Sequence, residues 1–508
     1  MGKQLEWGGV YLFPVLGSRQ MKKLISALLI IIILAAILVS SVPILKGGSQ
    51  IAKYSDYFDT PERYDIVFLG SSHPLMATLP LELWKDYGYS SYNLANYGQL
   101  IQADYWLLKL ILTKSAPKLV VLDLYSTQYN DEFNSTNSEY MHGLMDCFPI
   151  SKLKYDAIKD IFPEDMQKEY FFPLFYYHSK WEKINKSNFV LPEENYFFGQ
   201  GSDESAFYGI STATRVRPYS DMGNIDSTES EKTDTLGKDY LKKIFDLCRK
   251  NNIEVMCTLV PFLAYDDEMK WMNSAIEICE ENNVPVCNGL TETEIDPATD
   301  MFDYGHLNSS GARKWTDTLG KFISEDFDIS RYTEGETYDF WANEYYSKYI
   351  NFKAEKISGQ SPMYNYLMLC ADKNLSVCLY IPEESDIFSD TESLALIGNL
   401  CRGMSNPVFS DCKESLNQYF CCIDNLSGRI YESDKQSEID SSTGVGEISL
   451  KDGVLFINGE TAADWNDYSP HGINKIQLGI AVIDNSSGSV LDTTWFYRSE
   501  TGNFVNAE

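Results

Sequence analysis

The chain has 508 residues, of which 44% are hydrophobic and 23% are charged, and its formal net charge is −31. A chain of this length is expected to form two or three domains rather than one core. The negative charge argues against a nucleic-acid-binding protein, because such a surface cannot neutralise a row of phosphates.

The eleven cysteines include no Cys-x-x-Cys pair, and most of them stand in apolar stretches. This pattern predicts buried free thiols that act as small hydrophobic side chains. Cys421 and Cys422 are adjacent, so in a strand they point to opposite faces and at most one is expected to face the core. No His-Glu-x-x-His motif and no spaced cluster of Cys and His indicates a metal site.

The first predicted element is an uncharged apolar stretch at residues 24–45. A helix over this stretch is long enough to cross a hydrocarbon core of about 30 Å. Arg19, Lys22 and Lys23 precede it, which places residues 1–23 in the cytoplasm and the rest of the chain outside the membrane. A cleaved signal peptide is the alternative. The length of the apolar run and the lack of a following Ala-x-Ala motif favour a retained transmembrane anchor.

Residues 64–330, which follow a polar linker at 46–63, alternate between continuous apolar stretches and amphipathic stretches. Apolar strands connected by helices indicate a parallel sheet covered on both faces, so we expect a doubly wound, flavodoxin-like α/β fold. The expected strands are residues 65–70, 92–95, 119–124, 253–260 and 284–287, and the expected helices are residues 81–86, 99–113, 238–250, 268–281 and a last one from Ser310.

An aromatic-rich insertion at residues 126–235 interrupts this pattern, with aromatic clusters at 170–181 and 194–198. Such a segment cannot be a solvated loop. We therefore expect a helical cap beside the crevice at the carboxyl ends of the strands, where open α/β sheets bind ligands.

The composition changes near residue 331. Residues 331–362 are rich in Trp and Tyr and predict a connecting helix. Residues 363–508 predict a separate β-rich domain, in which turn dipeptides such as Asn458-Gly459 separate short strands. We expect the two regions to have separate cores and to unfold independently. The strands expected in the last region are residues 375–381, 419–423, 453–457 and 476–483.

Two turns carry the residue types that acyl chemistry needs. Gly70, Ser71 and Ser72 follow the first expected strand, and Asp303 and His306 precede the last expected helix. In a doubly wound sheet both turns lie at the same edge. A serine nucleophile needs a histidine that takes its proton and a carboxylate that orients the histidine. Among the five histidines, only His306 combines an acidic residue three positions earlier with a loop that closes the sheet. The sequence therefore predicts a catalytic triad formed by a serine of the first turn with Asp303 and His306.

These motifs resemble those of the SGNH/GDSL hydrolase superfamily over residues 64–325, in particular the branch that contains DltD-like and polysaccharide O-acetylation proteins. The resemblance implies a catalytic triad of Ser72, Asp303 and His306, with Ser72 as the nucleophile. It also implies that the N–H groups of Ser72 and Gly98 form the oxyanion hole; a plain glycine at the start of a helix is the alternative for Gly98. One departure follows the third strand, where Asp123-Leu-Tyr125 replaces the family's oxyanion asparagine. The departure fits a transferase better than a simple lipase-type hydrolase.

Two further resemblances concern binding. Within the insertion, Tyr177-His178 and Trp181 resemble a recurring element of these bacterial proteins, which gives His178 and Trp181 as candidate substrate-binding residues. A hydrogen-bonded histidine in an aromatic cap is the alternative. Residues 364–500 resemble the interleukin-like EMT inducer (ILEI) module, although the spacing after Asn474 departs from it. That resemblance implies carbohydrate binding, and a spacer or packing domain is the alternative.

Together these features predict a membrane-anchored, extracytoplasmic serine acyltransferase or esterase that needs no cofactor and no metal. Its expected substrate is an O-acyl group, acetyl in the first place, of a cell-surface polysaccharide. A membrane-bound O-acyltransferase is an expected partner by analogy alone. The alternative is a catalytically silent glycan-binding surface or assembly protein.

Overall fold

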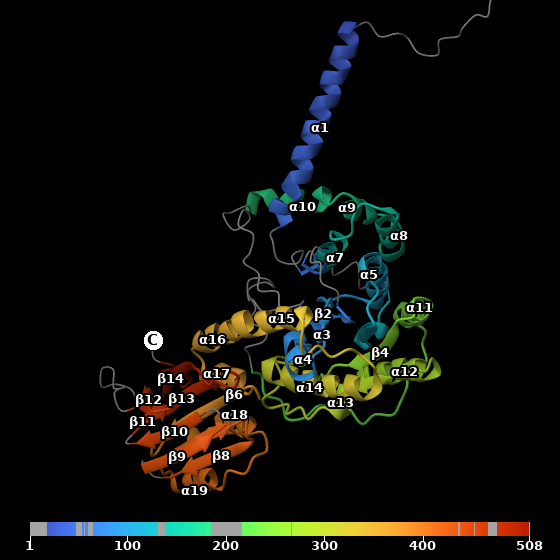
Figure 1. Cartoon of the computed structure of the whole chain (residues 1–508). Helices are drawn as coiled ribbons and strands as arrows, with labels where there is room; N and C mark the ends of the chain where they lie inside the picture. Colours follow the sequence, from blue (N-terminus) through green and yellow to red (C-terminus); the bar gives the residue numbers. More distant parts are fainter. Residues whose placement is uncertain are drawn as a thin grey trace, which may run out of the picture. The chain divides into compact units, whose positions relative to one another are not determined.

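The fold is described from a computed structural model of the whole chain (Figure 1). The structure describes residues 18–46, 53–54, 56–58, 64–130, 138–183, 216–265, 267–434, 437–444, 446–451, 453–465 and 475–506. The chain divides into two compact units, one formed by Met1–Gly48 with Glu164–Glu193 and one formed by Ser49–Pro163 with Glu194–Glu508. Each unit is described by itself.

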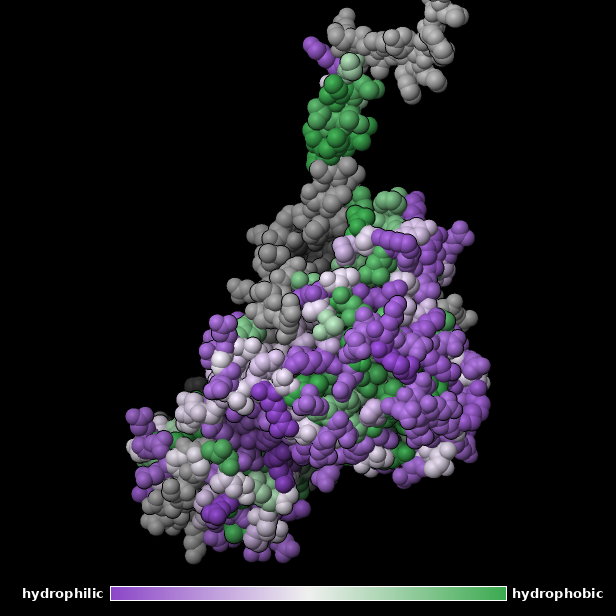
Figure 2. Space-filling view, turned by 45° about the vertical axis from the view of Figure 1, so that its right-hand side comes forward, coloured by the Kyte–Doolittle hydropathy of each residue, from purple (hydrophilic) through white to green (hydrophobic). Residues whose placement is uncertain are grey.

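The first unit contains a long helix that covers the predicted membrane segment. This helix, α1 (Ser18–Lys46), contacts two short helices of the insertion, α10 (Leu174–Tyr177) and η2 (His178–Lys183). Figure 2 shows the described part of α1 as an apolar surface, and its Leu24 side chain is 62% exposed. Within the described residues, no helix is long and apolar enough to cross a membrane. Part of the predicted span, at residues 35–36 and 38–44, lies outside the described side chains, and the predicted anchor is not confirmed.

The second unit is built on a five-stranded parallel sheet in the order β2-β1-β3-β4-β5. Ile66 lies between Ser91 and Leu119 in the register of the three neighbouring strands. This order is that of flavodoxin-like doubly wound sheets, in which ligands bind at the carboxyl ends of the strands. The predicted α/β fold with a parallel sheet is confirmed. The strands are β1 (Ile66–Leu69), β2 (Ser91–Asn93), β3 (Leu119–Asp123), β4 (Glu254–Leu259) and β5 (Val286–Asn288).

Helices pack on this sheet, which explains why β1 and β3 are buried along their whole length. Phe68 and Val121 share one hydrophobic cluster with Trp315 and Leu319 of the last helix. Helix α4 packs on α14, and α5 packs on α11 (Figure 1). The helices are α3 (Ser72–Ala77), α4 (Pro80–Tyr87), α5 (Ile101–Lys114), α11 (Leu236–Lys250), α12 (Glu268–Glu281), α13 (Gly289–Glu292) and α14 (Ser309–Asp326).

The described part of the aromatic insertion is mostly helical up to residue 183, as expected, whereas residues 216–235 contain no helix. The insertion is also divided between the two units. Helix α8 packs on α5, where the Asp160 carboxylate accepts a hydrogen bond from Trp106 Nε1 at 2.6 Å. Residues 164–193 belong to the first unit, and residues 184–215 lie outside the described residues. The expected position of a cap beside the crevice is therefore not confirmed. The remaining helices of the insertion are η1 (Tyr125–Gln128), α7 (Ser138–Met145), α8 (Lys152–Ile161) and α9 (Gln167–Phe171).

A helical segment then leads to the C-terminal region. It consists of α15 (Glu336–Asn343), η5 (Glu344–Tyr349) and α16 (Ile350–Ser358). The C-terminal region contains a six-stranded antiparallel sheet in the order β15-β14-β13-β6-β7-β8 and a four-stranded antiparallel sheet in the order β12-β11-β10-β9. The predicted β-rich character of this region is confirmed. Its strands are β6 (Leu375–Ile381), β7 (Tyr419–Asp424), β8 (Arg429–Ser433), β9 (Ser437–Thr443), β10 (Gly446–Lys451), β11 (Val454–Ile457), β12 (Glu460–Asp464), β13 (Ile476–Asp484), β14 (Val490–Arg498) and β15 (Phe504–Asn506).

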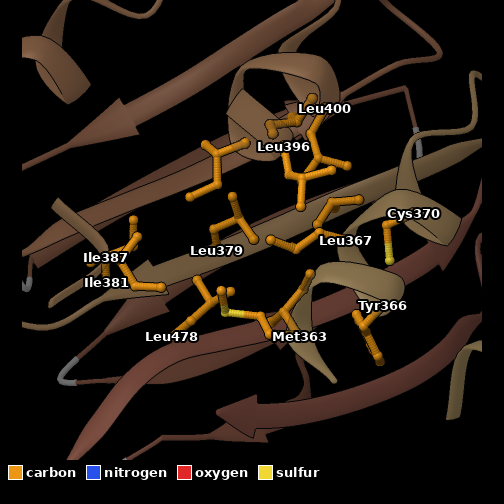
Figure 3. Close-up of a cluster of buried hydrophobic side chains, with 14 of the residues drawn as sticks. Met363, Tyr366, Leu367, Cys370, Leu379, Ile381, Ile387, Leu396, Leu400 and Leu478 are labelled. Carbon is orange, nitrogen blue, oxygen red and sulfur yellow. The ribbon is translucent and has the colours of Figure 1, made fainter. Parts of the chain in front are cut away.

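Helices that the sequence analysis did not predict cover one face of the six-stranded sheet. They are α17 (Met363–Cys370), α18 (Thr391–Cys401) and α19 (Pro407–Ser415), with the short η6 (Asp386–Ser389). Figure 3 shows Met363, Leu367, Leu396 and Leu400 of two of these helices pointing toward Leu379 of β6. The other face of this sheet packs on the four-stranded sheet.

All eleven cysteines are free, and all except Cys147 are buried. Cys421 belongs to the cluster on the helical face of the six-stranded sheet, and Cys422 belongs to the cluster between the two sheets. The expectation that at most one of this pair faces a core is therefore wrong, because both faces of the sheet are covered.

Candidate active site

Ser72 lies in the turn after β1, and the conformation of this turn depends on Gly70. The φ angle of Gly70 is 141°, and a Cβ atom there would lie 2.6 Å from the Cβ of Asp123. Only glycine fits both the conformation and the space. Ser72 is the first residue of α3 and is partly exposed, so the turn presents its hydroxyl group at the carboxyl edge of the sheet.

Ser71 points into the protein instead. It is buried, and its hydroxyl group donates to Asp123 Oδ2 at 3.3 Å. Ser71 Oγ itself accepts the N–H of His73 at 3.5 Å. Burial raises the pKa of Asp123 to about 7, although hydrogen bonds from Tyr125 N–H, the Ser71 hydroxyl and a further N–H oppose the rise. Ser71 and Asp123 thus support the turn from below, and Ser72 is the serine that faces outward.

The structure brings the three predicted triad residues together. His306 Nε2 lies 2.7 Å from Ser72 Oγ, and His306 Nδ1 lies 2.8 Å from Asp303 Oδ1. Asp303 Oδ1 also accepts the N–H of Gly305 at 2.8 Å. Burial favours a higher pKa for Asp303, but the hydrogen bond and charge of His306 with the N–H of Gly305 outweigh burial and lower it. Asp303 is therefore an anion at neutral pH and can orient the imidazole ring.

A closed loop holds the two triad residues that precede α14. Met301 and Leu307 pair as a β-bridge across the loop. Asn308 then caps α14, accepting the N–H of Ser310 at 3.0 Å, and its Nδ2 donates to the carbonyl oxygen of Thr299 at 2.7 Å. The loop and the first turn of α14 consequently form one hydrogen-bonded piece.

The loop after β2 contains Gly98, the second predicted oxyanion donor. The N–H of Asn96 donates to the carbonyl oxygen of Gly70 at 3.0 Å, which brings this loop against the nucleophile turn. Gly98 has a φ angle of 59°, a left-handed conformation that glycine adopts without strain. Within the described part of the chain, no group accepts the N–H of Ser72 or of Gly98. Both donors are thus available to an oxyanion.

No protein-family model matches this chain, and no curated protein is significantly similar to it. In the part of the chain that the structure describes, no group of His, Cys, Asp and Glu side chains could hold a metal ion.

The sequence analysis missed one residue of this site, His73. Its side chain is 4% exposed, and its ring stacks on Tyr125 with the centroids 3.9 Å apart. The ring also meets the His306 ring edge-on, with the centroids 5.4 Å apart. Burial and the neighbouring His306 lower the pKa of His73, against the opposing charge of Asp303. A neutral imidazole therefore packs against the triad histidine. His73 directly follows Ser72 in the sequence, and this position could have indicated that its ring lies at the site.

An exposed tyrosine lies within the triad loop. Tyr304, between Asp303 and His306 in the sequence, is 58% exposed, and its carbonyl oxygen accepts the N–H of Leu263. Tyr265 lies two residues after Leu263, in the loop that follows β4, and is 42% exposed. Aromatic rings of this kind offer flat surfaces for stacking on a sugar ring.

The structure does not place the other two candidate binding residues at this site. His178 and Trp181 belong to the first unit, which is described by itself. His178 is exposed, and its Nδ1 lies 2.6 Å from the carbonyl oxygen of Phe175. Trp181 is 64% exposed. Their substrate-binding role stays a prediction.

Proposed function

We propose that this chain is an SGNH-type serine acyltransferase or esterase, anchored in the membrane with its catalytic region outside the cell. Its substrate is an O-acyl group, acetyl in the first place, of a cell-surface polysaccharide. The hydrogen-bonded series Ser72–His306–Asp303 at the carboxyl edge of the sheet carries the proposal. Side chains from two distant parts of the sequence meet there in the order that nucleophilic catalysis requires.

The first half-reaction acylates the protein. His306 Nε2 takes the proton of Ser72 as the hydroxyl oxygen attacks the carbonyl carbon of the acyl donor. Asp303 holds the other ring nitrogen and stabilises the imidazolium that forms. The N–H groups of Ser72 and Gly98 bind the oxyanion, and one such donor contributes about 3 kcal/mol of transition-state stabilisation. His306 then protonates the leaving oxygen, and the acyl group stays on Ser72.

The second half-reaction reverses these roles. His306 takes a proton from a hydroxyl group of the acceptor, the acceptor oxygen attacks the acyl-Ser72 ester, and the proton returns to Ser72. With a sugar hydroxyl as acceptor the outcome is transfer, and with water it is hydrolysis. The exposed ring of Tyr304, within the triad loop, favours a sugar acceptor.

A membrane-bound O-acyltransferase is the proposed source of acyl groups, by analogy alone. The C-terminal region and the pair His178 and Trp181 are proposed to contact the polysaccharide, on the strength of the resemblances given above.

The proposal is tested by labelling the full-length chain in detergent with a fluorophosphonate and by measuring turnover of a small acetyl ester. Ser72→Ala should abolish labelling and reduce turnover by at least about a thousandfold, because the covalent route is lost. His306→Ala should match it, since members of a triad act as one unit. Asp303→Asn should retain weak residual activity, because the imidazole is held in the wrong tautomer.

Ser71→Ala is the matched control, because it changes the neighbouring serine that points inward. Its turnover of the ester should fall by less than about tenfold, because the variant only weakens the cap of α3. A wild-type chain that neither reacts with the probe nor turns over the ester would exclude a serine enzyme and favour a silent glycan binder. Mass analysis of an oligosaccharide added to the assay then separates transfer from hydrolysis.

A further inference from the structure

We propose that the C-terminal β-rich region supports the loop that carries Asp303 and His306, and that Asn399 is the positioning residue through which it does so. This inference rests on the proposed function of the triad. It gives the C-terminal region a second role besides the carbohydrate binding that its resemblance implies.

The contact joins α18 to the first turn of α14. Asn399 Nδ2 lies 2.8 Å from Ser310 Oγ and 3.3 Å from Asp300 Oδ1. Ser310 and Asp300 are both buried. A side chain of the C-terminal region therefore completes a hydrogen-bonded cluster inside the region that holds the triad.

Asp300 connects this cluster to the triad loop. Its carboxylate accepts the Ser310 hydroxyl at 2.8 Å and pairs with Lys314 of α14 at 2.6 Å. Its backbone carbonyl accepts the N–H of Asn308 at 3.0 Å. Because Asn308 also closes the loop through Thr299, a shift of Asp300 or Ser310 moves both ends of the loop. The distance between His306 Nε2 and Ser72 Oγ depends on that loop.

Buried ion pairs hold the C-terminal region in place for this contact. Lys353 of α16 lies 2.6 Å from Glu82 of α4 and 2.8 Å from Asp372, which follows α17. Arg313 of α14 lies 3.1 Å from the same Asp372 carboxylate. Glu82, Lys353 and Asp372 are almost completely buried. If the C-terminal region were joined only by a flexible linker, these charged side chains would stay in water. Their burial in ion pairs therefore indicates a fixed interface between the C-terminal region and the region that holds the triad.

The variant that tests the inference is Asn399→Leu in the full-length chain in detergent, because it removes both hydrogen bonds and keeps the number and branching of the heavy side-chain atoms. We expect kcat for a small acetyl ester to fall by about ten- to a hundredfold, as misplacement of a reacting group does. KM should stay within about twofold, since the ester binds away from α18. The pH profile of kcat should also shift, because His306 sits differently between Ser72 and Asp303. Asn417→Leu, an exposed asparagine of the same region, is the control and should behave as the wild type.

Ser310→Ala provides a second approach if Asn399→Leu lowers the melting temperature. It removes the acceptor of the same contact without changing α18, and it should give the same fall in kcat. The double variant should lose less kcat than the two single losses combined, because the two residues share the contact between Asn399 and Ser310. A wild-type kcat and pH profile in Asn399→Leu, or in Ser310→Ala where the first variant unfolds, overturns the support role. Inactivity of the wild-type chain together with absent Ser72 labelling would instead overturn the proposed function.

Discussion

Two buried carboxyl groups lie beneath the nucleophile turn, and their charge state links stability to pH. Burial raises the pKa of Asp123 to about 7 and that of Asp104 to about 8, and the charge of Asp123 adds to the rise at Asp104. Asp104 accepts hydrogen bonds from the Gln99 side chain and the N–H of Gly70, so both carboxyls support the same turn. In the unfolded chain each would ionise near its ordinary pKa of about 3.9.

The sign of the effect follows from the direction of these shifts. Between about pH 4 and pH 7 the folded chain keeps a proton on Asp123 that the unfolded chain releases, so folding stability falls as pH rises through this window. Asp123→Asn removes the titration of Asp123 and leaves that of Asp104. It should make the decline of melting temperature between pH 4.5 and pH 8.5 less steep, and the melting temperature should rise most, relative to the wild type, at the alkaline end. Thermal unfolding followed by circular dichroism measures this slope. Asp226→Asn is the control, because Asp226 is exposed. An equal slope of melting temperature against pH in Asp123→Asn and in the wild type would contradict this prediction.

At the scale of single elements, the sequence predicted what continuous patterns encode. Strand β1 is wholly apolar, β3 is apolar up to its last residue, Asp123, and α12 has the bounds that its helical spacing indicates. The two motifs of the triad were found because the nucleophile turn and the His306 loop both flank such patterns. Helix α3 was missed because it is short, and α17 because it is buried and has apolar residues on most sides. The contact between Asn399 and Ser310 depends on tertiary packing alone, and no local pattern of the sequence carries it.

The cap of α14 is an element with two separable roles. Asn308 caps the helix through its Oδ1 and holds the loop through Nδ2. Asn308→Ala should lower the free energy of unfolding by about 1 kcal/mol, the usual cost of a lost cap, and should slow fluorophosphonate labelling of Ser72. Asn308→Ser keeps a capping hydroxyl but loses the bond to Thr299, so it should recover most of the stability and stay slow in labelling. Urea denaturation and labelling rates measure the two effects, and unchanged labelling in both variants would refute the second role.

At the scale of the whole molecule, the change in composition near residue 331 predicts two cores that unfold independently. The structure has separate hydrophobic clusters on the two sides of that boundary. It also buries Lys353 between Glu82 and Asp372, one carboxylate from each side. Separate cores therefore do not suffice for independent unfolding, because opening the interface would expose paired charges or leave them unpaired.

This coupling is tested with Lys353→Met, which leaves two buried carboxylates without their common partner. Breaking a buried pair in this way costs about 3–5 kcal/mol, so the variant should unfold at lower denaturant and in two steps rather than one. Lys348→Met is the matched control, because Lys348 pairs with Glu344 on the surface of the same helical segment and such pairs contribute at most about 1 kcal/mol. Two resolved transitions already present in the wild-type chain would show that the ion pairs do not couple the regions.

The composition of the first unit has a practical consequence for producing the protein. That unit combines Met1–Gly48 with Glu164–Glu193, and α1 contacts α10 and η2. In an expression fragment that begins after residue 48, α10 and η2 would lack the helix α1 that they contact. We expect such a fragment to aggregate or to be cleaved by proteases at these helices. A well-behaved soluble fragment needs two edits, with the leading helix removed and residues 164–193 replaced by a short Gly/Ser bridge.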